Sequence, residues 1–302
     1  MTDGKRGQNQ VFQGGNPPPG QPQPQQQPDG NPPPVGIPNM PAEHRAIDDL
    51  GYEIPVDLVP LPSRGLVYGT NSTLHGREGV EIRAMTARDE DILTSRALIK
   101  KGTVISHLLR SCMNDKSINP NDLLLADRNA LMVALRITGY GADYAVEVSC
   151  PQCNEKEQNE FDLQELPIKW LELTPDAPGE NLFSMDLPVS KKRIQFRFLT
   201  GRDEEELSRD AEQRKKKLKT SFDNLITSQL ARLIVSVDGK QERMYISKFI
   251  ANMSVRDSRV LRKYIEDHQP GIDMQSNFTC GNCGESSEVE VPIGTTFFWP
   301  DA

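Results

Sequence analysis

The sequence has no apolar run of about eighteen residues, the length that a helix needs to cross a bilayer, so no membrane span is expected. Its N-terminus also lacks the apolar core of a signal peptide, and we expect a soluble protein made inside the cell. A Walker loop, a GxGxxG fingerprint and a nucleophile elbow are absent as well. With no such group to carry chemistry, we predict no enzymatic activity and no catalytic residues.

Histidine is scarce, and basic charge is outweighed by acidic charge. The four histidines, His44, His75, His107 and His268, are scattered singly, which is typical of surface or core positions rather than of ligands or bases. The net charge of −8 gives no support for nucleic-acid binding. The basic run from Arg214 to Lys219 follows an acidic stretch and has no interleaved aromatic residues for base stacking. We therefore interpret it as one face of a solvated helix.

Cysteine is also infrequent, but four of the five cysteines form two pairs with a two-residue gap. The pairs are Cys150-Pro151-Gln152-Cys153 and Cys280-Gly281-Asn282-Cys283. Such a gap lets both thiolates of a pair reach the same ion. Strand-like runs flank each pair, so each is predicted at the tip of a hairpin. The fifth cysteine, Cys112, lies in an apolar helical stretch and is interpreted as a small buried hydrophobic residue.

Two hairpin tips of this kind form a zinc ribbon, in which four thiolates surround one Zn²⁺ ion as a tetrahedron. We predict that Cys150, Cys153, Cys280 and Cys283 hold one zinc ion. The site is expected to be structural, because four sulfur ligands leave no position open for a water molecule. Thiolates used in this way fit a reducing compartment.

The two pairs are far apart in the sequence, since well over a hundred residues lie between Cys153 and Cys280. Closing so long a loop costs about 2 kcal/mol more than closing an ordinary ribbon loop. A structural zinc contributes on the order of 10–16 kcal/mol, so the metal outweighs this cost if the intervening segment folds as its own unit. The alternatives are two buried thiol pairs or two local redox dithiols. A redox pair needs a thioredoxin-like βαβ setting, which the flanking hairpin pattern does not offer.

These patterns predict an α+β fold that is mainly helical, with a two-hairpin zinc ribbon split by a long helical insertion. The composition divides the chain into a Pro/Gln/Gly-rich tail, an extended arm with an α-helical unit, the two ribbon halves and an inserted, mainly helical lobe. The corresponding ranges are 1–45, 46–149, 150–168 with 274–296, and 169–273. The tail cannot bury enough apolar surface to offset its conformational entropy, and we expect it to be disordered or locally polyproline II.

Several helix boundaries and one aromatic segment are also predicted. Thr86 is a good N-cap with acidic residues in the first turn after it, and Asp127 is predicted to cap the helix that follows it. An amphipathic helix is expected over 225–237. The aromatic segment 297–300 either docks on the core or contacts a partner, and the sequence leaves both open.

Four blocks of the sequence carry a family resemblance. They are Leu61 to Tyr68 (LPSRGLVY), Ile82 to Thr94, Asp127 to Ile137, and Tyr140 to Tyr144, the last running on to Cys150 and Cys153. With these blocks the chain resembles the baseplate hub or tail-assembly proteins of T-even-type contractile-tailed bacteriophages. The likeness is good over about 55–165, looser over the helical insertion and the second cysteine pair, and absent from the N-terminal tail.

The resemblance implies a structural protein that helps to build the baseplate at the tip of the phage tail. It implies other tail or baseplate proteins as partners, and a location in the virion tail or, during assembly, in the host cytoplasm. No catalytic residue carries over. The alternative is a zinc-ribbon nucleic-acid-binding or transcription-associated factor, which only the ribbon supports, and the oligomeric state stays open.

Overall fold

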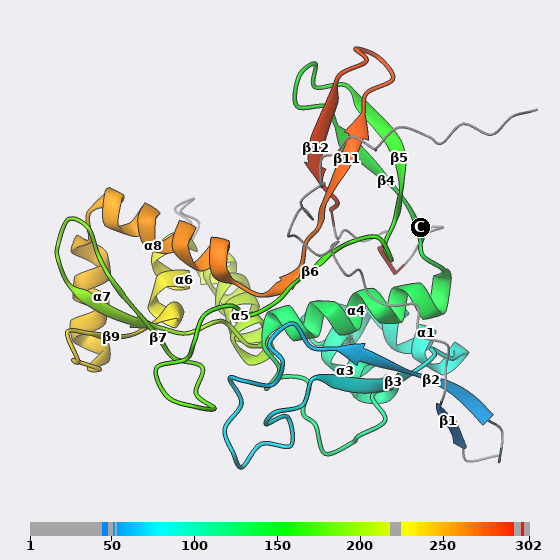
Figure 1. Ribbon diagram of the computed structural model, residues 1–302, viewed down its shortest axis with the longest axis horizontal. Coiled ribbons are helices and arrows are strands. Elements are labelled where there is room, and N and C mark those ends of the chain that lie inside the picture. The colour runs from blue at the N-terminus through cyan, green and yellow to red at the C-terminus, as the bar shows by residue number, and fades with distance from the viewer. Residues whose placement is uncertain (1–43, 48–50, 52, 218–224, 293–296, 299–302) are drawn as a thin grey trace, which may run out of the picture. The chain divides into compact units, whose positions relative to one another are not determined.

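The computed structural model describes residues 44–47, 51, 53–217, 225–292 and 297–298, all of them within a unit that spans 34–302. Helices and strands are both present along this part of the chain, as an α+β fold requires (Figure 1). The predicted tail at 1–45 lies almost entirely outside the described residues. Among the helices that are described, none is both long enough and apolar enough to cross a membrane.

An antiparallel sheet in the order β1-β2-β3 precedes the first helices. Its strands are β1 (His44–Ile47), β2 (Glu53–Pro60) and β3 (Gly79–Arg83). The chain leaves β2 through a turn at 63–65, where Arg64 and Gly65 have positive φ angles of 52° and 69°. A side chain at position 65 would collide with the backbone of Arg77, at 2.5 Å from its nitrogen, so this tight turn requires glycine.

Four helices follow the sheet, and the last of them packs against β2. They are α1 (Ala87–Thr94), α2 (Arg96–Lys101), α3 (Val104–Cys112) and α4 (Leu125–Tyr140). Thr86 caps α1 as predicted, through a reciprocal capping box with Asp89. Cys112 is fully buried at the end of α3, in agreement with its interpretation as a core residue.

Asp127 does not cap α4, as the sequence suggested, because α4 already begins at Leu125 and Asp127 lies inside its first turn. Its buried carboxylate instead accepts hydrogen bonds from the Ser63 N–H at 2.9 Å, the Ser63 hydroxyl at 2.6 Å and the Tyr68 hydroxyl. The Tyr68 oxygen in turn accepts from the Leu124 N–H at 2.9 Å. Burial raises the pKa of Asp127, although these donors oppose the rise. The carboxylate therefore fastens the loop after β2 to the start of α4.

Replacing Asp127 with alanine should lower the free energy of unfolding by about 2–4 kcal/mol, because three buried donors of Ser63 and Tyr68 lose their acceptor. Urea unfolding of purified protein measures this. Asp91→Ala is the control, because Asp91 is exposed on α1 and its loss should stay within about 0.5 kcal/mol. Equal losses in the two variants would contradict the assigned anchor.

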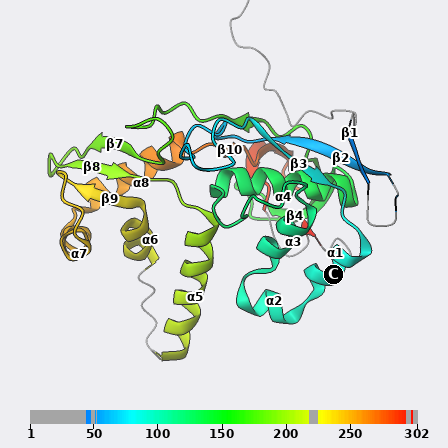
Figure 2. The same ribbon diagram turned by 90° about the horizontal axis from the view of Figure 1, so that it is seen from below.

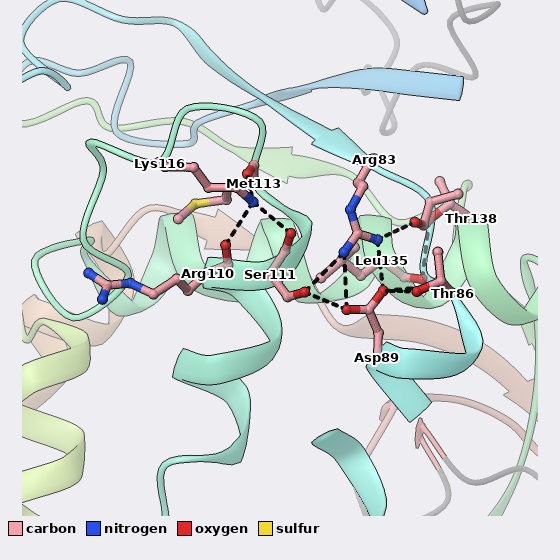
Figure 3. Close-up of polar contacts among 10 residues, drawn as sticks. Arg83, Thr86, Asp89, Arg110, Ser111, Met113, Lys116, Leu135 and Thr138 are labelled. Atoms are coloured by element: carbon pink, nitrogen blue, oxygen red, sulfur yellow. Dashed lines mark hydrogen bonds and ion pairs between the residues drawn. The ribbon is translucent and has the colours of Figure 1, made fainter. Parts of the chain in front are cut away.

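A second polar anchor joins β3 to α1 and α3 (Figure 3). The Arg83 guanidinium donates to both carboxylate oxygens of Asp89, at 2.7 and 3.2 Å, and the Ser111 hydroxyl donates to the same carboxylate at 2.6 Å. Burial opposes ionisation of Asp89, but the hydrogen bonds from Arg83, Ser111 and Thr86 lower its pKa well below the usual range. Lys116 closes the end of α3 by donating to three backbone carbonyls, at 2.7–3.1 Å.

Asp89→Asn should cost about 2 kcal/mol of unfolding free energy at pH 7, because the charged hydrogen bonds from Arg83 are lost. Since folding lowers the pKa of Asp89, its contribution is complete above the unfolded-state value of about 4 and declines as the pH falls further. Urea titrations from pH 7 to pH 3 should show the difference between wild type and variant constant above about pH 5 and narrowing below about pH 4. For the exposed Asp91→Asn, the difference should be small at every pH.

The inserted lobe contains a second three-stranded sheet, in the order β7-β8-β9, and four helices. Its strands are β7 (Phe183–Asp186), β8 (Arg193–Phe196) and β9 (Ile234–Val237). Its helices are α5 (Gly201–Lys217), α6 (Leu225–Leu233), α7 (Arg243–Asn252) and α8 (Val255–His268). Stacked and edge-on aromatic rings of Phe183, Phe196, Phe198 and Tyr264 fill the space between the sheet and α8.

The helix predicted over 225–237 is too long, because α6 ends at Leu233 and the next four residues form β9. These residues, Ile-Val-Ser-Val, include three with branched β-carbons, which favour strands. They pair with β8, with Val237 opposite Ile194, and pack beside α6 and α7 (Figure 2). Pairing in the sheet thus overrides the helical spacing of the apolar residues.

Candidate metal centre

Two antiparallel hairpins carry the cysteine pairs at their tips (Figure 1). The first consists of β4 (Asp143–Ser149) and β5 (Lys156–Asp162), and the second of β11 (Gln275–Thr279) and β12 (Ser286–Glu290). Each forms a two-stranded sheet of its own. Alternation explains the local fold, because Tyr144, Val148 and Phe161 bury their side chains while their neighbours along the strands are exposed.

The two tips have the same backbone geometry. In the first, the Cys150 N–H donates to the Glu155 carbonyl at 2.8 Å, and the left-handed residue after the second cysteine is Asn154, with φ 58°. In the second tip, the N–H of Cys280 donates to the carbonyl five residues on at 3.0 Å, and Gly284 has φ 72°. Asparagine and glycine tolerate this conformation best. Each turn thus folds back on itself and directs its two thiols to one point.

The four cysteines converge on a single cluster. The Cys150 and Cys283 sulfurs are 3.7 Å apart, as are those of Cys153 and Cys280, and all four lie within 4.8 Å of one another. The cysteines are free thiols, and their separations far exceed the roughly 2.05 Å of a disulfide bond. With zinc–sulfur bonds of about 2.3 Å, a tetrahedron has sulfur–sulfur edges of about 3.8 Å. The cluster therefore fits one tetrahedral metal ion and can hold it.

The protonation of the cluster is uneven. The backbone of Glu155 lowers the pKa of Cys153 to about 7. Against the lowering effect of the Glu285 backbone, desolvation and the three other sulfurs raise the pKa of Cys283 to about 12. One thiolate therefore forms easily, and its charge opposes the next. A bound cation reverses this opposition, because it favours every thiolate in its coordination sphere.

Further contacts tie the two hairpins together around the cluster. The Glu157 carboxylate accepts from the Gly281 N–H at 2.9 Å, and the Asn282 side-chain amide lies 3.7 Å from the Cys153 sulfur. These groups reach from one hairpin to the turn of the other. They fix the relative orientation of the two cysteine pairs and make outer contacts of the kind that orient metal ligands.

The C-terminal aromatic segment docks on the first hairpin, which decides between the two expectations for it as far as it is described. Phe297 and Phe298 are buried, and the Phe297 ring meets that of Tyr144 edge-on with centroids 5.3 Å apart. The Tyr144 hydroxyl also donates to the Pro292 carbonyl at 2.9 Å. Trp299 lies outside the described residues.

A short ladder closes the inserted segment below the hairpins. Strand β6 (Ile168–Lys169) pairs with β10 (Gly271–Ile272), and the Asp273 N–H donates to the Pro167 carbonyl at 2.8 Å. The chain thus enters and leaves the inserted lobe through one antiparallel pair. This pair cannot be predicted from the sequence, because two-residue strands carry no periodic signal.

No histidine belongs to the cluster, which is the only group of three or more potential ligands found in the described part of the chain. His75 and His268 lie beside the backbone carbonyls of Tyr68 and Tyr264, at 2.6 and 2.8 Å. Both contacts fit the expectation of scattered, non-ligating histidines.

The family model for the T4 bacteriophage base plate protein matches residues 68–299, more than two thirds of the chain. The chain belongs to this family, as the four sequence blocks suggested. Family membership points to a structural role in the phage baseplate and to a place in the virion tail. Neither a curated protein nor a solved structure matches the chain.

Proposed function

We propose that this chain is a structural and assembly protein of the baseplate hub, which binds other tail proteins and is stapled by a structural zinc ion. The observation that carries the proposal is the convergence of four sulfurs from hairpins more than a hundred residues apart, in a member of a baseplate family. Cys150, Cys153, Cys280 and Cys283 would hold the ion in a zinc ribbon, and no ligand position would stay open for substrate.

In this proposal the zinc ion is a structural cross-link and takes part in no reaction. The chain's own residues form a scaffold with an arm and helical unit at 46–149 and an inserted lobe at 169–273, joined through the ribbon. Such a scaffold presents several rigid surfaces to neighbouring tail proteins, either in the virion tail or during assembly in the host cytoplasm.

A nucleic-acid-binding role has less support. Residues 143–165 and 273–292, which include both hairpins, contain eleven acidic residues and one basic residue, Lys156. Phosphate backbones are bound by clustered lysine and arginine, and this region would repel them. We therefore propose no second function for the metal centre.

Purified protein should contain one zinc ion per chain, and Cys150→Ser and Cys280→Ser should each lose it. The free energy of unfolding should fall by several kcal/mol in both variants, because metal binding and folding of the hairpins are coupled. Elemental analysis and urea unfolding measure the two effects. Cys112→Ala is the control, since its thiol lies outside the cluster and its zinc content should stay at one. Wild-type zinc and stability in both serine variants would refute the shared site.

The proposed place in the tail is tested separately. Phage tails purified from a host that supplies the protein in tagged form should contain it at a defined ratio to other baseplate proteins. Tails or assembly intermediates should be incomplete when the host supplies the Cys150→Ser variant instead. A protein that never co-purifies with tails or with their precursors would contradict the assembly role, whatever its zinc content.

A further inference from the structure

The hairpins leave strand edges unpaired at the metal centre. In β4, the Cys150 N–H bonds back to Glu155, and in an antiparallel pair only every second residue bonds to its partner. The backbone groups of Ser149 and Glu147 therefore point away from β5. No third strand joins this hairpin in the described residues.

The same holds for β12 in the second hairpin. The Val291 N–H donates to the Met274 carbonyl at 2.7 Å, so the backbone groups of Glu290 and Glu288 point away from β11. This sheet also has two strands only, as far as the chain is described. Two unpaired edges thus belong to neighbouring hairpins whose tips are held together.

A groove of about 290 Å³ lies between these edges. Its lining includes Glu147, Val148 and Ser149 of β4 and Glu288, Val289 and Glu290 of β12, together with Pro151 and Pro292. We call it the edge groove. Its walls combine exposed carboxylates with the two valines, and its rims carry backbone groups that no strand among the described residues satisfies. An added strand would pair with such rims, and main-chain hydrogen bonds supply the affinity in this mode of recognition.

The acidic charge around the edge groove indicates which kind of partner fits it. The two hairpin segments carry a net charge of −10, compared with −8 for the whole chain, so the acidic character of the protein is concentrated here. Glu147 is paired with Lys156 at 2.8 Å, while Glu288 and Glu290 have no ion-pair partner among the described residues. A second copy docking by the same edge would place carboxylates against carboxylates, which disfavours self-association.

We propose that the edge groove binds an extended, lysine- and arginine-rich segment of another tail protein, added as a β-strand along β4 or β12. The inference rests on the proposed assembly function and names the chemistry of one partner. Alternate residues of the segment would place their cations against Glu288 and Glu290, and the residues between them would meet Val148 and Val289.

The test uses the full-length zinc-loaded chain and three labelled eight-residue peptides, with binding measured by fluorescence anisotropy. The probe alternates lysine and valine, the second peptide alternates glutamate and valine, and the third alternates lysine and proline. The lysine–valine peptide should bind, and the glutamate–valine peptide should not. The lysine–proline peptide should bind at least tenfold more weakly, because proline keeps the charge of the probe but fixes φ near −65°, away from the extended conformation that pairing along the edge requires.

Two double variants place the site. Glu288→Gln with Glu290→Gln should weaken binding of the lysine–valine peptide at least tenfold. Glu160→Gln with Glu165→Gln removes the same charge from exposed positions outside the groove and should weaken it less than threefold. Both should retain zinc and wild-type stability.

Three results would overturn the inference. If the two double variants lost the same peptide affinity, or if the lysine–valine and lysine–proline peptides bound equally well, binding would be only nonspecific charge attraction. Self-association that is abolished by Glu288→Gln with Glu290→Gln would make a second copy the occupant. These measurements need no phage tails, so they test the groove separately from the assembly role. If the chain binds the peptide but never enters tails, the assembly role is contradicted and peptide binding by the groove is still supported.

Discussion

The convergence of four sulfurs from two distant cysteine pairs is the constraint on which the hairpin region depends. The entropic cost of joining these pairs looks large when it is counted along the sequence. The ladder between β6 and β10 changes that count, because Ile168 already pairs with Ile272. Only the short segments 154–167 and 273–279 then separate the ladder from the cysteines. The fold itself thus closes the long loop, and a metal ion would have to order only the tips.

The sequence predicted the parts of this structure that local chemistry determines. The gap within each cysteine pair, the alternation beside it and the Thr86 cap are all short-range signals, and the structure shows hairpins and a capping box at those places. The misjudged elements depend on distant partners. Residues 234–237 form a strand because β8 lies beside them. The Asp127 side chain does not cap its own helix, because its carboxylate accepts hydrogen bonds from Ser63 and Tyr68. Neither partner can be found by its spacing in the sequence.

The blocks that carry the family resemblance turn out to contain the buried polar anchors of the fold. Ser63 and Tyr68 lie in the first block, Arg83 and Asp89 in the second, and Asp127 in the third. Each of these groups satisfies another buried or partly buried polar group, and its loss would leave that partner unpaired. The blocks that carry the resemblance therefore contain residues that hold the fold together, as a structural component of a baseplate requires.

The acidic hairpins also bear on how such a scaffold avoids pairing with itself. Unpaired strand edges are a liability, because they invite other copies of the same chain to add to the sheet. Glu147, Glu288 and Glu290 lie at these edges, and their like charges repel an identical edge. The same charges attract a basic strand, so one set of side chains both excludes the wrong partner and selects the right one. An apolar edge would bind more partners and discriminate among them less, and an assembly that must add its components in order depends on that discrimination.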